Sequence, residues 1–329
     1  MIIDFQHHFM PLQLAERRGF DVSKPGNLME GGIPKLTVHE RLYNMDAQIR
    51  DMDSVGIDVG ALSCNLGWDA PVEDCRLIND SAADLQRRYP NRFVGFAHAP
   101  ILEPGGLNEI ERGVKQLGLR GATIASQVKG LPLDASEYKP FYTLACDLDL
   151  AIFVHPAMIP LGYSLFNEYD LARIIGREAD LQIAVTRVIA GRVMEEFPDL
   201  KLIFSHFGGG IAAVKERLEA KAGRFGTLKR PFSESFERLY FDTAGFEGGP
   251  IALRCALAGI RADRLVFATD YPQDFTGATT QSGKGVRQIG EYIDLIHRLA
   301  PESAEAILGG TAARLLHLEE KSTAKRSGS

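Results

Sequence analysis

The 329-residue sequence lacks long apolar runs, basic patches and paired cysteines, and each absence excludes a class of protein. No window reaches about 18 uncharged apolar residues, and the opening MIIDF carries no basic segment before an apolar stretch. We therefore expect a cytoplasmic protein without a membrane partner. Four scattered cysteines form no C-x-x-C pair, which excludes a zinc knuckle and a disulfide framework. The net charge of -6, with no compact Lys/Arg cluster before the tail, argues against a nucleic-acid partner.

Short apolar, β-branched runs recur along the chain and alternate with segments of helical periodicity. These runs cover residues 1–8, 58–64, 93–100, 119–126, 150–157, 200–209, 239–245 and 265–272. Apolar strands that alternate with helices predict a parallel sheet covered on both faces. Eight such units favour an α/β fold of the (β/α)8 barrel type. An open doubly wound sheet is the main alternative, but no G-x-G-x-x-G follows the first run.

The longest irregular insert, residues 11–40, follows the first predicted strand and contains SKPGNLMEGGIPKL. Loops that follow the strands of a barrel lie over its catalytic face, so we expect this insert to form part of a substrate lid. The last residues, KSTAKRSGS, are polar. We therefore predict one barrel domain over residues 1–320 and a flexible tail at residues 321–329.

Polar side chains stand at the ends of four predicted strands. They are Gln6 and His8, His155, His206, and Asp270. In a barrel the carboxyl ends of all strands meet in one mouth. A single buried histidine is more often a hydrogen-bonded core residue than a metal ligand. Several polar groups in one apolar mouth are costly, however, and a bound cation would compensate them, so the pattern predicts a metal site.

Side-chain alternation decides which residues of the QHH motif face this mouth. In an extended chain Gln6 and His8 share one face, which is the spacing of a ligand pair, and His7 faces the helix layer. His98 and Asp242 also lie near strand ends. Each of them either lines the mouth or is a hydrogen-bonded residue of the barrel.

Motifs spread over nearly the whole chain match one known family. They include IDFQHHFMP, IFVHP, FPDLKLIFSHFGG, LYFDTAG and LVFATDYP, in this order. With these motifs the sequence resembles the amidohydrolase-2 family of the amidohydrolase superfamily, which contains 2-amino-3-carboxymuconate-6-semialdehyde decarboxylase and γ-resorcylate decarboxylase. The resemblance implies a TIM barrel of the metal-dependent hydrolase type. Members are often dimers or tetramers, so we expect a homodimer or homotetramer.

The resemblance also implies a ligand set for one divalent metal ion, with zinc as the first expectation and manganese as the alternative. The ligands would be Gln6, His8, His155 and Asp270. His206 would lie beside the metal and orient or deprotonate the bound water or the substrate. Binuclear relatives carry a lysine at the end of the fourth strand, whereas this strand ends in TIAS. A single metal ion is therefore expected.

Gln6 departs from the family pattern, which has histidine or, in some decarboxylases, glutamate at this position. A neutral amide is a weak donor for zinc compared with imidazole or carboxylate. Three alternatives follow. Gln6 is a weak ligand, or it lies outside a set of three ligands plus solvent, or the barrel works without a metal.

Three hypotheses for function follow from these residues. In a non-oxidative decarboxylase of a small aromatic or enol-type carboxylic acid, the cation would stabilise developing charge, and His206 or Asp270 would handle the proton. Arg41 would bind the substrate carboxylate, unless it is simply a solvated arginine. In a hydrolase or hydratase acting on a lactone, an amide, a C–C bond or a double bond, Asp270 would be the base. The third hypothesis is a degenerate, non-catalytic binder of small molecules.

Overall fold

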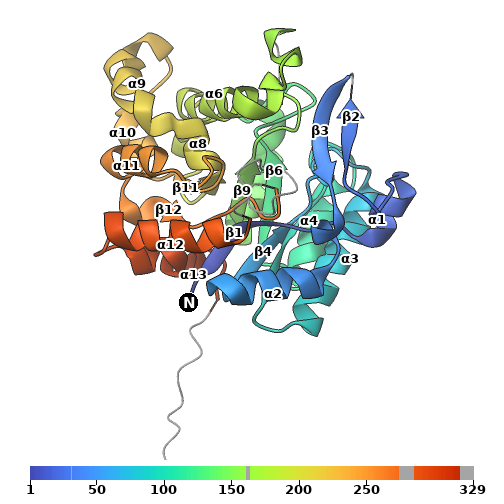
Figure 1. Ribbon diagram of the computed structural model, residues 1–329. Helices are drawn as coiled ribbons and strands as arrows, with labels where there is room; N and C mark the ends of the chain where they lie inside the picture. The colour runs from blue at the N-terminus through green and yellow to red at the C-terminus, as the bar shows by residue number, and fades with distance from the viewer. Residues whose placement is uncertain (31, 161–163, 274–284, 319–329) are drawn as a thin grey trace, which may run out of the picture.

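The computed structural model describes residues 1–30, 32–160, 164–273 and 285–318, so the predicted tail at 321–329 lies outside the described residues. In the described part of the chain, an eight-stranded sheet has the order β1-β4-β5-β6-β9-β10-β11-β12 (Figure 1). Its strands are β1 Ile3–His8, β4 Val59–Ser63, β5 Phe93–Ala97, β6 Gly121–Ala125, β9 Ala151–His155, β10 Lys201–Phe204, β11 Tyr240–Asp242 and β12 Leu265–Val266. Neighbouring strands are parallel throughout.

Backbone hydrogen bonds join the first strand to the last and close the sheet into a barrel. The backbone N–H of Phe5 donates to the carbonyl of Phe267 at 2.9 Å, and that of His8 donates to the carbonyl of Tyr271 at 2.7 Å. His7 and Tyr271 also form a parallel bridge. The predicted (β/α)8 barrel is confirmed, and the open doubly wound alternative is excluded because a closed sheet has no free edges.

The barrel interior is packed with apolar side chains. Phe5, Phe96 and Phe153 meet there with ring centroids between 5.2 and 5.8 Å apart. Ala312 and Leu315, from the helix α13 (Thr311–Leu315), belong to the same cluster. A larger apolar cluster fills the space between the strands and the helices. Because the interior is packed, polar chemistry is restricted to the mouth of the barrel.

Helices surround the barrel (Figure 1). They are α1 Leu12–Arg17, α2 Met45–Val55, α3 Val72–Arg88, α4 Gly106–Lys115, α5 Lys139–Asp147, α6 Arg177–Ala190, α7 Val193–Glu196, α8 His206–Gly210, α9 Lys215–Lys221, α10 Phe232–Phe236, α11 Pro250–Gly259, α12 Arg287–Leu299 and α13 Thr311–Leu315. The helix α2 contacts α12, so the helix layer continues across the seam between the first and last strands. Within the described residues, every helix is too short or too polar to cross a bilayer.

The insert at residues 11–40 is more regular than predicted. After α1 it forms an antiparallel hairpin of β2 (Gly26–Glu30) and β3 (Ile33–Val38). Polar pairs join the two strands: Lys35 bonds Glu30 at 2.6 Å, and Thr37 donates to Asn27 at 2.9 Å. Such pairs stabilise a hairpin without an apolar alternation in the sequence, which is why the prediction of an irregular insert was wrong. A shorter hairpin, β7 (Gln127–Val128) with β8 (Leu131–Pro132), follows β6.

Candidate metal centre and active site

A β-bulge in β1 turns Gln6 and His8 toward the barrel mouth. Phe5 packs in the barrel interior, and strict alternation would have placed His7 on the same side. The register against β4 shifts between Asp4 and His7. His7 therefore faces the helices, as predicted, and its Nδ1 lies 2.8 Å from Oδ2 of Asp4. Bulges re-aim side chains in this way and are frequent at functional sites.

Donor atoms of His8, His155 and Asp270 converge at the mouth of the barrel. One atom from each residue lies within 4.8 Å of the others. His8 and His155 end β1 and β9, and Asp270 follows β12. Two imidazoles and one carboxylate form a donor set typical of catalytic zinc sites, which keep a fourth position open. The sheet thus brings together three of the residues that the sequence predicted as metal ligands.

Both imidazoles are oriented to present Nε2 to the mouth. Nδ1 of His8 lies 2.9 Å from Oγ of Ser63, and Nδ1 of His155 lies 2.8 Å from the carbonyl oxygen of Pro156. Such partners on Nδ1 fix each ring with Nε2 toward the mouth, where Nε2 of His8 lies 2.7 Å from Oδ1 of Asp270 and a metal would take the place of this contact. The ring of His155 also stacks on Trp68, with centroids 4.2 Å apart. Burial lowers the pKa of His155 well below its ordinary value, so the ring is neutral, as a metal ligand must be.

The side chain of Gln6 is fully buried among these donors, and within the described residues only the nitrogen of its amide has hydrogen-bond partners. Its Nε2 donates to Oδ1 of Asp270 at 2.8 Å and lies 3.4 Å from Nε2 of His8. Its Oε1 has no partner in the part of the chain that the structure describes. A buried carbonyl oxygen without a partner is unfavourable, and rotating the amide exchanges two atoms of nearly equal shape. The residues therefore fit a cation, because the rotated amide would present its oxygen as a fourth donor.

His206 is held at the mouth by Glu178, a residue of α6. Its Nδ1 lies 2.8 Å from Oε1 of Glu178, and both side chains are buried. Burial alone would lower the pKa of His206, but the charge and hydrogen bond of Glu178 raise it to about 10. His206 is therefore an imidazolium at neutral pH. Its Nε2 lies 3.3 Å from Nε2 of Gln6. The sequence around Glu178, GREAD, carries no motif that could have identified this partner.

Residues 206–210, labelled α8, form a left-handed turn rather than a right-handed α-helix, with φ values from 52° to 74°. The strand predicted at residues 200–209 therefore ends early, at Phe204. Left-handed backbone costs an L-residue about 1–2 kcal/mol, and glycine avoids this cost. A Cβ on Gly209 would lie 2.0 Å from the carbonyl oxygen of Glu178. The glycine thus allows the turn that carries His206 to pack directly against the helix that carries its partner.

Asp242 and His98, the two other strand-end candidates, support the mouth of the barrel but do not present their side chains as donors there. Oδ1 of Asp242 accepts the backbone N–H of His206 at 2.7 Å, and burial raises the pKa of this carboxyl to about 7. His98 is fully buried, with Nε2 accepting the backbone N–H of Cys64 at 2.9 Å and Nδ1 lying 3.0 Å from the carbonyl oxygen of Phe96. Asp242 therefore fixes the backbone of His206, and His98 is a hydrogen-bonded core residue.

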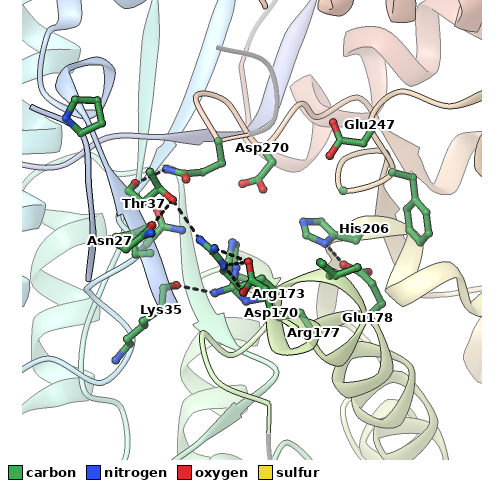
Figure 2. A pocket seen from close by; sticks show the side chains of 18 of the residues that line it. Asn27, Lys35, Thr37, Asp170, Arg173, Arg177, Glu178, His206, Glu247 and Asp270 are labelled. Carbon is green, nitrogen blue, oxygen red and sulfur yellow. Dashed lines mark hydrogen bonds and ion pairs between the residues drawn. The ribbon is translucent and has the colours of Figure 1, made fainter. Parts of the chain in front are cut away.

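A cavity of about 790 Å³ opens onto the metal donors (Figure 2). Its walls come from the β2–β3 hairpin, the start of α6 with the residues before it, the end of β9, and the segments after β4, β10, β11 and β12. The lining includes Pro25, Gly26, Asn27, Lys35, Leu36, Thr37, Asn65, His155, Asp170, Arg173, Ile174, Arg177, Glu178, His206, Gly245, Phe246, Glu247, Asp270 and Gln273. The hairpin of the insert thus forms one wall of the space that leads to the mouth.

Arg41 does not line this cavity. Its Nε donates to Oδ2 of Asp51 at 2.9 Å, and its Nη1 donates to Oε1 of Glu40 at 2.9 Å. The choice of Arg41 as the carboxylate-binding residue is therefore not supported, because its guanidinium is already paired with acidic side chains outside the cavity. The basic residues that line the cavity are Lys35, Arg173 and Arg177.

Comparison with known proteins gives one family and a consistent set of relatives. A family model described as amidohydrolase matches residues 3–318. The decarboxylase orsB of Emericella nidulans is 28% identical over 262 residues, which are 73% of this chain and 77% of that protein. The 2-amino-3-carboxymuconate-6-semialdehyde decarboxylase of Dictyostelium discoideum is 24% identical over 342 residues, which are 96% of this chain and 92% of that protein.

A solved structure shares the fold. The dihydroxybenzoic acid decarboxylase from Polaromonas, determined with bound manganese and the inhibitor 2-nitroresorcinol, superimposes with a TM-score of 0.77 at 24% identity. The match covers 97% of this chain and 97% of that chain. At this identity the likeness establishes the barrel architecture.

Proposed function

The chain belongs to the amidohydrolase family, and on this premise we propose that it is a metal-dependent, non-oxidative decarboxylase of a small aromatic or enol-type carboxylic acid. The observation that carries the proposal is the convergence of His8, His155 and Asp270 within 4.8 Å, next to the His206–Glu178 pair. Relatives over most of the chain's length bear the names of decarboxylases. Zinc is the first candidate for the ion, and manganese is the alternative.

His8, His155 and Asp270 would hold the ion, with Gln6 as a fourth donor. When bound, the cation would act as a Lewis acid and stabilise negative charge on a carboxylate or hydroxyl oxygen beside the scissile C–C bond. Burial alone would raise the pKa of Asp270, but the hydrogen bond from His8 holds it below its ordinary value. Asp270 is therefore an ionised ligand and not the proton donor.

We assign the proton to Nε2 of His206. When the C–C bond breaks, carbon dioxide leaves and the electron pair remains on the ring carbon, which then takes up a proton. His206 is protonated at neutral pH on both ring nitrogens. Its Nδ1–H is bonded to Glu178, so the N–H of Nε2 faces the mouth. A positioned acid of this kind typically contributes about 10²–10⁴-fold to the rate.

The test is incubation of the metal-loaded protein in D₂O with a panel of hydroxylated benzoic acids, such as 2,6-dihydroxybenzoate, and hydroxylated benzenedicarboxylic acids. We expect carbon dioxide release and one deuterium in the aromatic product. Incorporation of ¹⁸O from labelled water without carbon dioxide would instead establish the hydrolase or hydratase alternative. Absence of both reactions across the panel would favour a non-catalytic binder.

We also propose a homodimer or homotetramer. Exposed large apolar side chains are frequent between residues 165 and 183, at Leu165, Tyr169, Ile174, Ile175 and Ile183. Exposed apolar patches on a soluble protein often mark an interaction surface. Light scattering of the purified protein would test this, and a monomer at micromolar concentration would contradict it.

A further inference from the structure

Besides His206, the described lining of the cavity contains one lysine and two arginines, and two of these three side chains are already neutralised by acidic neighbours. Lys35 bonds Glu30 at 2.6 Å. Arg173 is paired with Asp170 through both Nε and Nη2, at 2.5 to 3.0 Å. These two side chains therefore offer little positive charge to a ligand.

Arg177 differs from both. Its Nε and Nη2 donate to the carbonyl oxygen of Met158 at 3.3 and 3.0 Å, and Nη2 also donates to the carbonyl oxygen of Lys35 at 2.7 Å. In the described part of the chain no carboxylate lies within ion-pair distance of this guanidinium, and Nη1 has no hydrogen-bond partner. Burial lowers the pKa of Arg177 to about 10, which still leaves it charged at neutral pH. Arg177 is thus a desolvated cation that lines the cavity without a counter-ion.

The charges of Asp270, Glu178 and Asp170 favour the charged form of Arg177, but among the described residues none of these carboxylates forms an ion pair with it. Glu178 is bonded to His206, and Asp270 is bonded to His8 and Gln6. Figure 2 shows Glu247 well apart from Arg177. A desolvated guanidinium without a directly bonded carboxylate is unfavourable, so the natural partner of Arg177 is an anion brought by the ligand.

Resting on the proposed function, we infer that the substrate carries a second carboxylate, which Nη1 of Arg177 binds while the reacting end of the molecule lies at the metal donors. The substrate class is then an aromatic or enol-type dicarboxylic acid. One unpaired cation matches a singly charged carboxylate better than a doubly charged phosphate. A guanidinium nitrogen with free N–H groups also forms strong charge-assisted bonds to a carboxylate.

The alternative role of Arg177 is a tether, because its bonds to Lys35 and Met158 join the hairpin to the loop after β9. A tether and an anion receptor differ in selectivity. Loss of a tether would weaken all ligands of the cavity together. Loss of the receptor would weaken only those with a second negative charge.

The experiment measures binding by calorimetry to the metal-loaded protein. The probes are benzoate and the three isomeric benzenedicarboxylates, which lack the hydroxyl group next to the scissile bond. We expect the best isomer to bind wild-type protein at least tenfold more tightly than benzoate. In Arg177→Met this ratio should fall below threefold with benzoate affinity nearly unchanged, and Arg177→Lys should restore part of it. Arg41→Met, which removes a cation outside the cavity, should keep the wild-type ratio.

Two outcomes would overturn the inference: no preference for any dicarboxylate in wild-type protein, or an equal loss of benzoate and dicarboxylate binding in a folded Arg177→Met protein. Thermal unfolding followed by circular dichroism establishes that each variant is folded. Binding requires no turnover, so the result is separable from the proposed reaction. A preference for dicarboxylates without carbon dioxide release would sustain the receptor and contradict the decarboxylase.

Discussion

Nε2 of Gln6 lies 2.8 Å from Oδ1 of Asp270, so the amide hydrogen-bonds a carboxylate of the metal donor set. The variant Gln6→His replaces this amide with an imidazole, a stronger ligand for zinc. We expect the dissociation constant of a divalent ion to fall by about tenfold or more, which is roughly 1.4 kcal/mol. Competition with a metal-sensitive dye would measure it. An unchanged constant in Gln6→His, and also in Gln6→Leu, would place position 6 outside the ligand set.

Removal of Glu178 should change the pH dependence of the reaction. Glu178 helps to raise the pKa of His206 from its ordinary 6.5 to about 10, so the wild-type acid stays protonated through neutrality. In Glu178→Gln the supporting charge is lost and the pKa of His206 falls. The rate should then decline at a lower pH as the solution becomes alkaline, while the rate at acidic pH falls less. A pH–rate profile of kcat would show this shift, and an alkaline limb that stays in place would contradict the assignment of His206 as the acid.

Gly209 should be intolerant of substitution. Its φ is 70°, and an added Cβ would lie 2.0 Å from the carbonyl oxygen of Glu178. We expect Gly209→Ala to lower the free energy of unfolding by about 3 kcal/mol, from left-handed strain together with overpacking. Gly226 is a matched control, because its φ is 69° and nothing lies within 4 Å of its Cβ position. Gly226→Ala should cost roughly 1 kcal/mol.

Urea unfolding of the two glycine variants gives the comparison directly. If both lose the same free energy, close packing against Glu178 contributes nothing and backbone strain alone accounts for the effect. A second readout is the affinity for a divalent ion. Gly209→Ala should reduce it because the turn that carries His206, which contacts Gln6, must shift, whereas Gly226→Ala should leave it unchanged.

Metal removal should lower stability as well as activity. An ion that binds the folded chain stabilises it by about 2.7 kcal/mol when present at a hundred times its dissociation constant. We therefore expect chelation to lower Tm, and zinc or manganese to restore it. In His155→Ala, which removes one imidazole of the donor set, added metal should raise Tm much less. A wild-type Tm that is insensitive to chelator would contradict the metal site.

The local sequence was enough to establish the barrel and to select the polar residues at its mouth. Each strand is a short apolar run, and a parallel barrel places the ends of such runs at one rim, so His8, His155, His206 and Asp270 could be grouped before any contact was known. The motifs also identified the family. These features are local because alternation and strand length depend on neighbouring residues only.

Contacts between distant segments decided the rest. The bulge in β1 depends on a partner strand, and the charge of His206 depends on Glu178, 28 residues away on a helix. Arg41 and Arg177 look alike in the sequence, yet acidic side chains neutralise the first, whereas the hydrogen bonds of the second within the described residues all go to carbonyl oxygens. The chemical state of a charged group is set by what surrounds it in space. Burial and partner charges exist only once the chain has folded.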